Sequence, residues 1–190
     1  MSKVSKHIGR MAAGFPLIFV GVVVYLHVAQ PNYDPVNQFM SELALGASGW
    51  LMLVAFLALG ASMAALGVGF LLTGASPAIV ALLSIAAGGF VGAGFVRLDV
   101  NANVHIGLVA LSFVTVALSM YLVPRCAEAF HGTKQIIVSW TLAAALGVSV
   151  ALGAGLIPVG VGQRLSALFL ILWSVWVGLK LSTIGTRANA

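Results

Sequence analysis

Residues 49–73 read GWLMLVAFLALGASMAALGVGFLLT, an apolar run of 25 residues without a charged side chain. The hydrocarbon core of a bilayer is about 30 Å thick, and about 20 residues of α-helix cross it. The run therefore predicts a transmembrane helix. Because it exceeds 20 residues, we expect this helix to be tilted or to extend beyond the hydrocarbon.

Five further runs of similar length make the whole chain read as a membrane protein. Of its 190 residues, 61% are hydrophobic and 7% are charged, whereas a soluble domain carries about 25% charged residues. The runs are continuous and lack the alternation of β-barrel strands. We predict an all-α, polytopic transmembrane bundle of six helices that forms a single domain over residues 1–190. The predicted spans are about 11–30, 49–73, 77–96, 104–124, 135–157 and 165–184.

The basic residues predict the orientation of this bundle. Seven of them fall on the face that carries both termini: Lys3, Lys6, Arg10, Arg125, Lys134, Lys180 and Arg187. The opposite face has only Arg97 and Arg164. By the positive-inside rule, both termini are cytoplasmic and the protein is a multi-pass protein of the cell membrane, expected to be the inner membrane. A nucleic-acid partner is not expected, because the basic residues form no patch or stripe.

The extracytoplasmic face collects most of the polar residues that a lipid-packed bundle does not need. It holds three of the four acidic residues. The set comprises His27, Tyr33, Asp34, Asn37, Gln38, Ser41, Glu42, Arg97, Asp99, Asn101, Asn103, His105, Gln163 and Arg164. Several of them stand at predicted helix ends, which converge when the helices pack together. The pattern therefore predicts an outward-facing polar pocket.

Histidine and carboxylate side chains in this set raise the question of a metal such as zinc. A three-histidine site is excluded, because the two remaining histidines of the chain lie on the cytoplasmic face. The ligands left for a divalent ion are His27, Glu42, Asp99 and His105, with Asp34 as a further carboxylate. The sequence leaves open whether a cofactor is present.

A second chemistry uses Ser41 as a nucleophile, His105 as its base and Asp99 to orient the imidazole. Together with Glu42 these are the candidate catalytic residues. The structural alternative makes Ser41 the N-cap of a short interfacial helix, with Glu42 near the positive end of its dipole.

The two outer arginines offer a role without catalysis. Arg97 and Arg164 can pair with Glu42 and Asp99 and close the outer end of the bundle. They can instead hold a phosphate or an anionic lipid head group. The predicted ligand-binding residues are His27, Arg97, Gln163 and Arg164.

Three elements resemble domain-of-unknown-function family 998, a family of bacterial and archaeal membrane proteins with about six helices. Tyr33–Pro35 followed by Met40–Ala44 resembles its signature loop. Asp99–His105 and Gly162–Arg164 resemble its second and third elements. The resemblance covers nearly the whole chain and implies the fold and a site, without an activity. Arg97 departs from the small or apolar residue expected there.

The leading hypothesis is that the outer pocket binds a lipid head group or a small polar ligand, with hydrolysis as an option. Whether the protein is an enzyme therefore stays open, as does its oligomeric state. One alternative is a small transporter or channel, although the span interiors offer only hydroxyl side chains. Another is a membrane partner subunit without catalysis.

Overall fold

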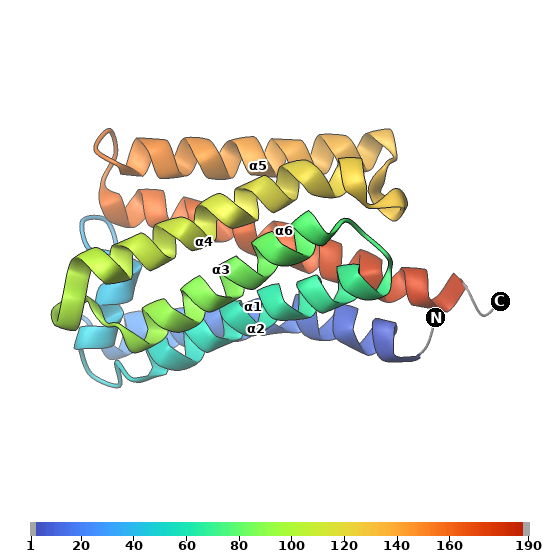
Figure 1. Ribbon diagram of the computed structural model, residues 1–190. Helices are drawn as coiled ribbons and strands as arrows, with labels where there is room; N and C mark the ends of the chain where they lie inside the picture. Colours follow the sequence, from blue (N-terminus) through green and yellow to red (C-terminus); the bar gives the residue numbers. More distant parts are fainter. Residues whose placement is uncertain (1–2, 188–190) are drawn as a thin grey trace.

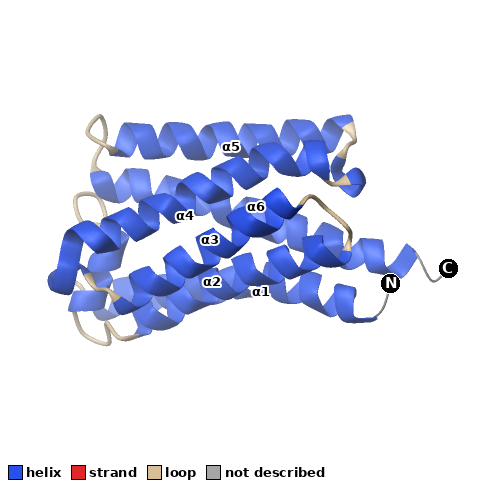
Figure 2. Ribbon diagram, viewed as in Figure 1, coloured by secondary structure: helices blue, strands red, loops and turns tan. Residues whose placement is uncertain are grey.

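The computed structural model describes residues 3–187, which form helices joined by short connections (Figure 1). The six long helices are α1 (Lys3–Ala29), α2 (Leu51–Leu72), α3 (Pro77–Phe95), α4 (Leu98–Cys126), α5 (Thr133–Gly153) and α6 (Val159–Arg187). Two short 3₁₀ helices, η1 (Met40–Leu45) and η2 (Glu128–Phe130), follow α1 and α4. Figure 2 shows only helix and loop over this range, in agreement with the predicted all-α class.

Each long helix is long and apolar enough to cross a bilayer. All six contain a segment with a mean hydropathy between 1.8 and 2.3. The shortest, α3, has 19 residues, and at about 1.5 Å per residue it roughly matches the thickness of the hydrocarbon. The chain is therefore an integral membrane protein with six candidate spans, as predicted.

The helices form a ring in chain order. Each long helix packs against the next one, and α6 returns to α1 to close the ring. Large side chains fill the interior, among them Phe56, Met63, Phe113 and Trp173, all less than 9% exposed. The tight turn between α2 and α3 makes these two helices antiparallel neighbours, as predicted.

The two ends of the bundle differ in what they carry (Figure 1). Both termini lie at one end, which we call the terminal end. The opposite end, which we call the loop end, carries the segment from α1 through η1 to α2, the α3–α4 turn and the α5–α6 connection. The polar residues predicted to converge are thus brought to one end of the molecule.

Helix α4 begins six residues before the predicted span because a short first turn precedes a break. Asn101 has extended backbone angles (φ −159°, ψ 94°) inside the helix. Its side chain accepts a hydrogen bond from Val104 N at 3.1 Å, as an N-cap does. The predicted start at residue 104 therefore marks the continuous part of α4, and Asp99 lies in the turn ahead of it.

Helix α6 also begins earlier than predicted, at Val159 instead of residue 165. The Pro158 carbonyl accepts hydrogen bonds from the amides of residues 161 and 162 and so starts the helical ladder. Gln163 and Arg164, expected just ahead of the span, lie within α6 and point from its second turn. Helix α5 ends at Gly153, four residues before the predicted end.

Helices α1 and α6 cross with their backbones in contact. A Cβ on Gly9 would lie 2.6 Å from Gly178 O, and a Cβ on Gly178 would lie 2.7 Å from Gly9 O and 2.8 Å from Ala13 N. These neighbours are backbone atoms, which cannot move aside as a flexible side chain can. Small residues permit such close helix packing in lipid.

Replacing Gly178 by alanine should therefore destabilise the bundle by about 1–3 kcal/mol, as overpacking does. The measurement is the Tm of the purified protein in detergent. Gly147→Ala on α5 is the matched control, because a Cβ there meets nothing within 4 Å. Equal Tm values for the two variants would contradict the backbone contact.

Candidate functional site

The η1 segment is held from both sides just ahead of Ser41. The amide of Met40 donates to Gln163 Oε1 at 2.5 Å, which ties the segment to α6. The hydroxyl of Tyr33 donates to the carbonyl of Phe39 at 2.9 Å. Ser41 itself is 3% exposed. Its position at the loop end is thus fixed by hydrogen bonds to the two preceding residues.

Arg164 extends this arrangement to α1. Its Nη2 donates to the Tyr33 hydroxyl at 2.7 Å and to His27 Nε2 at 2.9 Å. His27 Nδ1 lies 2.6 Å from Val23 O, so Nδ1 carries the proton and Nε2 accepts. Burial raises the pKa of Tyr33 above its ordinary value, and the phenol is a donor at neutral pH in either case. The four side chains that hold η1 are called the loop clamp: His27, Tyr33, Gln163 and Arg164.

Glu42 completes the start of η1. Its carboxylate accepts from Phe39 N at 2.8 Å and from Gln38 Nε2 at 3.0 Å, which is the backward half of a capping box. The N-cap position is Phe39, so the short helix was predicted correctly but Ser41 as its cap was wrong. Ser41 is instead the second residue of η1, and its hydroxyl forms no hydrogen bond with the described residues.

His105 has one satisfied and one unsatisfied ring nitrogen. Its Nδ1 lies 2.7 Å from Val96 O and 3.0 Å from Ala93 O. Since carbonyls only accept, Nδ1 carries the proton and Nε2 has a free lone pair. The side chain is 2% exposed, and Nε2 is a buried atom without a hydrogen-bond partner among the described residues. An unsatisfied buried polar group costs about 1–3 kcal/mol.

A cleft of about 470 Å³ opens beside Ser41 and His105, between α4, α5 and α6. We call it the seam cleft. Two side chains contribute polar groups that have no partner among the described residues: the Ser41 hydroxyl and the amide nitrogen of Gln163. His105 also lines the cleft, and its unpaired Nε2 is buried beside it. Most of the wall is apolar and includes Ile106, Val109, Phe113, Val150, Ile157 and Val159. The cleft thus combines an apolar channel with a small polar region near η1.

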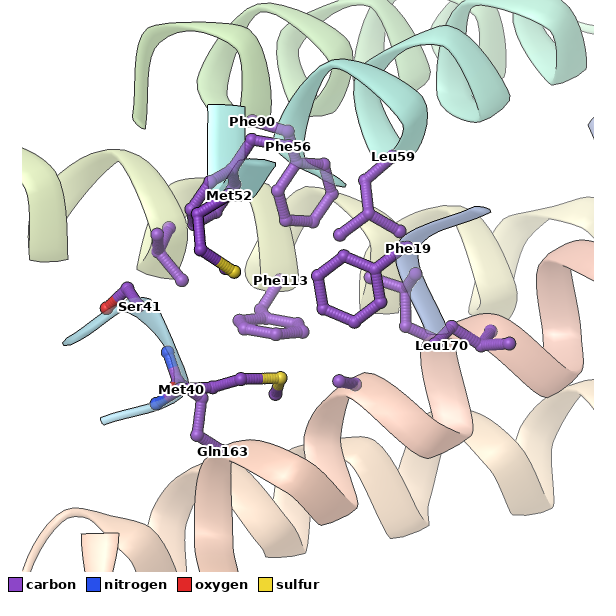
Figure 3. Close-up of a pocket in the computed structure, with 13 residues that line it drawn as sticks. Phe19, Met40, Ser41, Met52, Phe56, Leu59, Phe90, Phe113, Gln163 and Leu170 are labelled. Atoms are coloured by element: carbon purple, nitrogen blue, oxygen red, sulfur yellow. The ribbon is translucent and has the colours of Figure 1, made fainter. Parts of the chain in front are cut away.

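A cavity of about 20 Å³ adjoins the seam cleft and shares Ser41, Phe113 and Gln163 with it. Figure 3 shows Ser41 and Gln163 on one side of this cavity, with Phe19 and Leu59 opposite them. Its size is about that of one water molecule. The hydroxyl and amide groups therefore stand between the apolar core and the larger cleft.

Arg97 and Asp99 pair with each other and do not line the seam cleft. Arg97 does line a smaller cavity of about 30 Å³ together with Ser41 and His105. Arg97 Nη2 lies 2.6 Å from Asp99 Oδ2, and the two side chains are 48% and 46% exposed. The carboxylate considered for orienting His105 is thus engaged elsewhere, and two backbone carbonyls hold the imidazole instead. A surface pair of this kind contributes about 0–1 kcal/mol.

The residues considered as metal ligands are likewise distributed over separate contacts. His27 belongs to the loop clamp, Glu42 caps η1, Asp99 pairs with Arg97, and His105 lies at the seam cleft. Within residues 3–187 no three His, Cys, Asp or Glu side chains form a group that could hold a metal ion. The four candidate metal ligands therefore lie in separate contacts and do not converge on one point.

Two parts of the site were not singled out from the sequence. Tyr33 was counted among the outer polar residues and in the signature loop, but it was not named as a site residue. Its place between Pro31 and Pro35, shortly before η1, was the available signal. The apolar wall, for example Ile106 and Val150, carries no signal at all, because the lipid-facing positions of the same helices have the same composition.

Comparison with known protein families identifies the family to which the chain belongs. The chain belongs to the family described as "Protein of unknown function (DUF998)", which matches residues 12–180. The resemblance seen in the sequence is thereby confirmed. No curated protein and no solved structure matches the chain.

Tyr33→Phe tests the loop clamp, because it removes the hydroxyl that joins Arg164 to the Phe39 carbonyl. Losing about 1.4 kcal/mol of local stability should make amides of residues 38–45 exchange about tenfold faster. The measurement is hydrogen–deuterium exchange by mass spectrometry. Tyr25→Phe, at an exposed position on α1, should leave this exchange unchanged. Equal exchange in both variants would show that the clamp does not hold η1.

Proposed function

We propose that this protein binds an amphipathic ligand in the seam cleft, with the ligand's polar group against Ser41, His105 and Gln163 and its apolar part along α4 and α5. The single observation that carries the proposal is His105 Nε2, which is buried without a partner beside a cleft of about 470 Å³. A ligand donor at this position would satisfy the nitrogen and offset the cost of its burial.

The chemistry of the lining supports a ligand that is partly polar and partly apolar. His105 Nε2 is an acceptor, the Ser41 hydroxyl is both donor and acceptor, and the amide nitrogen of Gln163 is a donor. A hydroxyl or ester group matches this set, and a hydrocarbon chain matches the wall. Lipid-derived molecules such as monoacylglycerols combine both parts.

The distribution of charge supports an orientation for this site. By the positive-inside rule, the terminal end faces the cytoplasm, since seven basic residues belong to it and two to the loop end. The seam cleft then lies toward the extracytoplasmic face of the cell membrane, where the polar residues of the loop end meet the lipid head groups.

Hydroxyl groups within the spans favour a binding protein over a transporter. Ser112, Thr115 and Ser119 each donate to a carbonyl one turn back in α4. Hydroxyls bonded in this way satisfy their own helix, and they offer little to a solute crossing the bilayer.

The binding proposal is tested with a monoacylglycerol that carries a photoreactive diazirine in its acyl chain. We expect crosslinks in α4 around residues 106–113 and in α5 around Val150. Ala110→Trp should block the labelling because it fills the cleft, whereas Ala81→Trp, exposed on α3, should not. Labelling that is spread evenly over the lipid-facing helices, or insensitive to Ala110→Trp, would contradict the proposal.

His105→Asn sharpens this test. An asparagine amide keeps the donor that Nδ1 gives to the Ala93 and Val96 carbonyls but removes the free nitrogen. We expect roughly tenfold weaker competition by unlabelled monoacylglycerol, with an unchanged Tm. His131→Asn, at an exposed position, is the control. Unchanged competition in His105→Asn would show that Nε2 does not contact the ligand.

One observation favours a second candidate function, the hydrolysis of an acyl ester. The tautomer of His105 leaves a lone pair at Nε2, and His105 and Ser41 both line the seam cleft. Ser41 Oγ would attack the ester carbonyl carbon while its proton passes to His105 Nε2. The C–O bond then breaks, the leaving alcohol takes that proton, and water releases the acid by the same two transfers. The amide nitrogen of Gln163 is a donor for the oxyanion.

Hydrolysis is tested by following release of fatty acid from a monoacylglycerol. If the reaction occurs here, Ser41→Ala and His105→Asn should each slow it by about 100-fold or more. Ser84→Ala is the control, because that hydroxyl donates to Val80 O in its own helix. Turnover that survives Ser41→Ala would reject the hydrolase and leave the binding proposal intact.

A further inference from the structure

A second groove lies between α4 and α5, toward the terminal end. It has a volume of about 480 Å³ and is lined by α4 residues Val114, Leu118 and Tyr121 and by α5 residues Trp140 and Ala144. None of these residues lines the seam cleft. The groove is thus a separate apolar surface, which faces outward from the helix pair.

An arginine stands at the end of this groove over two aromatic rings. The guanidinium carbon of Arg125 lies 3.8 Å from the centroid of Tyr121 and 4.3 Å from that of Trp140. The two rings stack on each other at 5.6 Å, and Trp140 Nε1 donates to Tyr121 O at 3.2 Å. Cation–π contacts of this kind hold a guanidinium in place without neutralising its charge.

Among residues 3–187, the charge of Arg125 has no anionic counterpart. Within the part of the chain that the structure describes, no carboxylate forms an ion pair with it. Its recorded hydrogen bond is a long one, from Nη1 to Tyr121 O at 3.4 Å. The remaining N–H groups of the guanidinium have no hydrogen-bond partner among the described residues, and their fork matches the oxygens of a phosphate.

The dimensions of the groove fit one leaflet of a bilayer. Tyr121 lies five residues before the end of α4 and Val114 lies twelve before it, which places them about 8 Å and 18 Å from that end. One half of the hydrocarbon core is about 15 Å thick. With the end of α4 at the level of the phosphates, Arg125 would meet the head groups, and Tyr121 and Trp140 would stand at the depth typical of interfacial aromatic residues.

We propose that the groove between α4 and α5 binds an anionic phospholipid, whose acyl chain lies along Val114, Leu118 and Ala144 and whose phosphate is held by Arg125. Charge decides the class of lipid: a zwitterionic phospholipid carries its own cation beside the phosphate, whereas an anionic one supplies a net counter-charge to Arg125. This site is independent of the ligand proposed for the seam cleft.

The test is native mass spectrometry of the full-length protein in detergent, with phosphatidylglycerol and phosphatidylcholine of identical acyl chains as probes. We expect roughly tenfold stronger retention of phosphatidylglycerol. Arg125→Gln should abolish this preference, whereas Arg10→Gln, an exposed arginine at the same end of the bundle, should preserve it. Equal retention of both lipids, or an equal effect of the two arginine variants, would overturn the proposal.

Two further variants test where the lipid binds, separately from the charge of Arg125. Ala144→Trp fills the groove and should remove retention of both lipids, whereas Ala81→Trp should not. Phosphatidylglycerol with brominated acyl chains should quench tryptophan emission, and Trp140→Phe should remove most of that quenching. Retention unaffected by Ala144→Trp, or quenching unaffected by Trp140→Phe, would overturn the location. Ser84→Ala, at a hydroxyl that donates to Val80 O in its own helix, should leave all of these readings unchanged.

Discussion

Polar groups that folding removes from water must find hydrogen-bond partners within the protein, because neither an apolar core nor hydrocarbon offers any. The loop end is built around this constraint. Gln163 accepts a hydrogen bond from the Met40 amide, and the Tyr33 hydroxyl donates one to the Phe39 carbonyl. Gln30 donates to Leu43 O and Ala47 O at 2.9 and 2.8 Å. With these bonds made, the segment between α1 and α2 becomes a fixed wall. His105 Nε2, which is buried without a partner among the described residues, is an exception to this pattern.

The fold was largely predictable because the lipid environment imposes the same requirement on every residue of a long apolar segment. Continuous apolar runs in lipid leave only the helix as a spanning form, so composition alone yielded six helices. Their ends were less accurate, since hydropathy does not detect hydrogen bonds. Asn101 caps the continuous part of α4 by a side-chain contact, and α6 begins at a proline carbonyl, six residues before the hydropathy rises enough to define a span.

The sequence predicted which residues lie near the candidate site, but not which of them line the cleft. Ser41, His105 and Gln163 were named from the sequence and do line one cleft, whereas Asp99 and Arg97 pair on the surface nearby. The reason is directional. Gln163 and Arg164 are consecutive on a helix and so point about 100° apart: one faces the cleft and the other faces α1. Residue type and membrane face can be read from a sequence, but this division of roles depends on how far α6 is rotated.

Helix α5 has the smallest buried share of the six spans, 17% of its apolar window against 56% for α2. It also forms one wall of both the seam cleft and the groove at Arg125. Displacing it slightly breaks fewer packing contacts than displacing any other helix of the ring. A lipid-like molecule would therefore arrive sideways, by diffusion within the leaflet. Occupancy would then follow the partition of that molecule into the bilayer, so that a compound too insoluble to be measured in water can still saturate the protein.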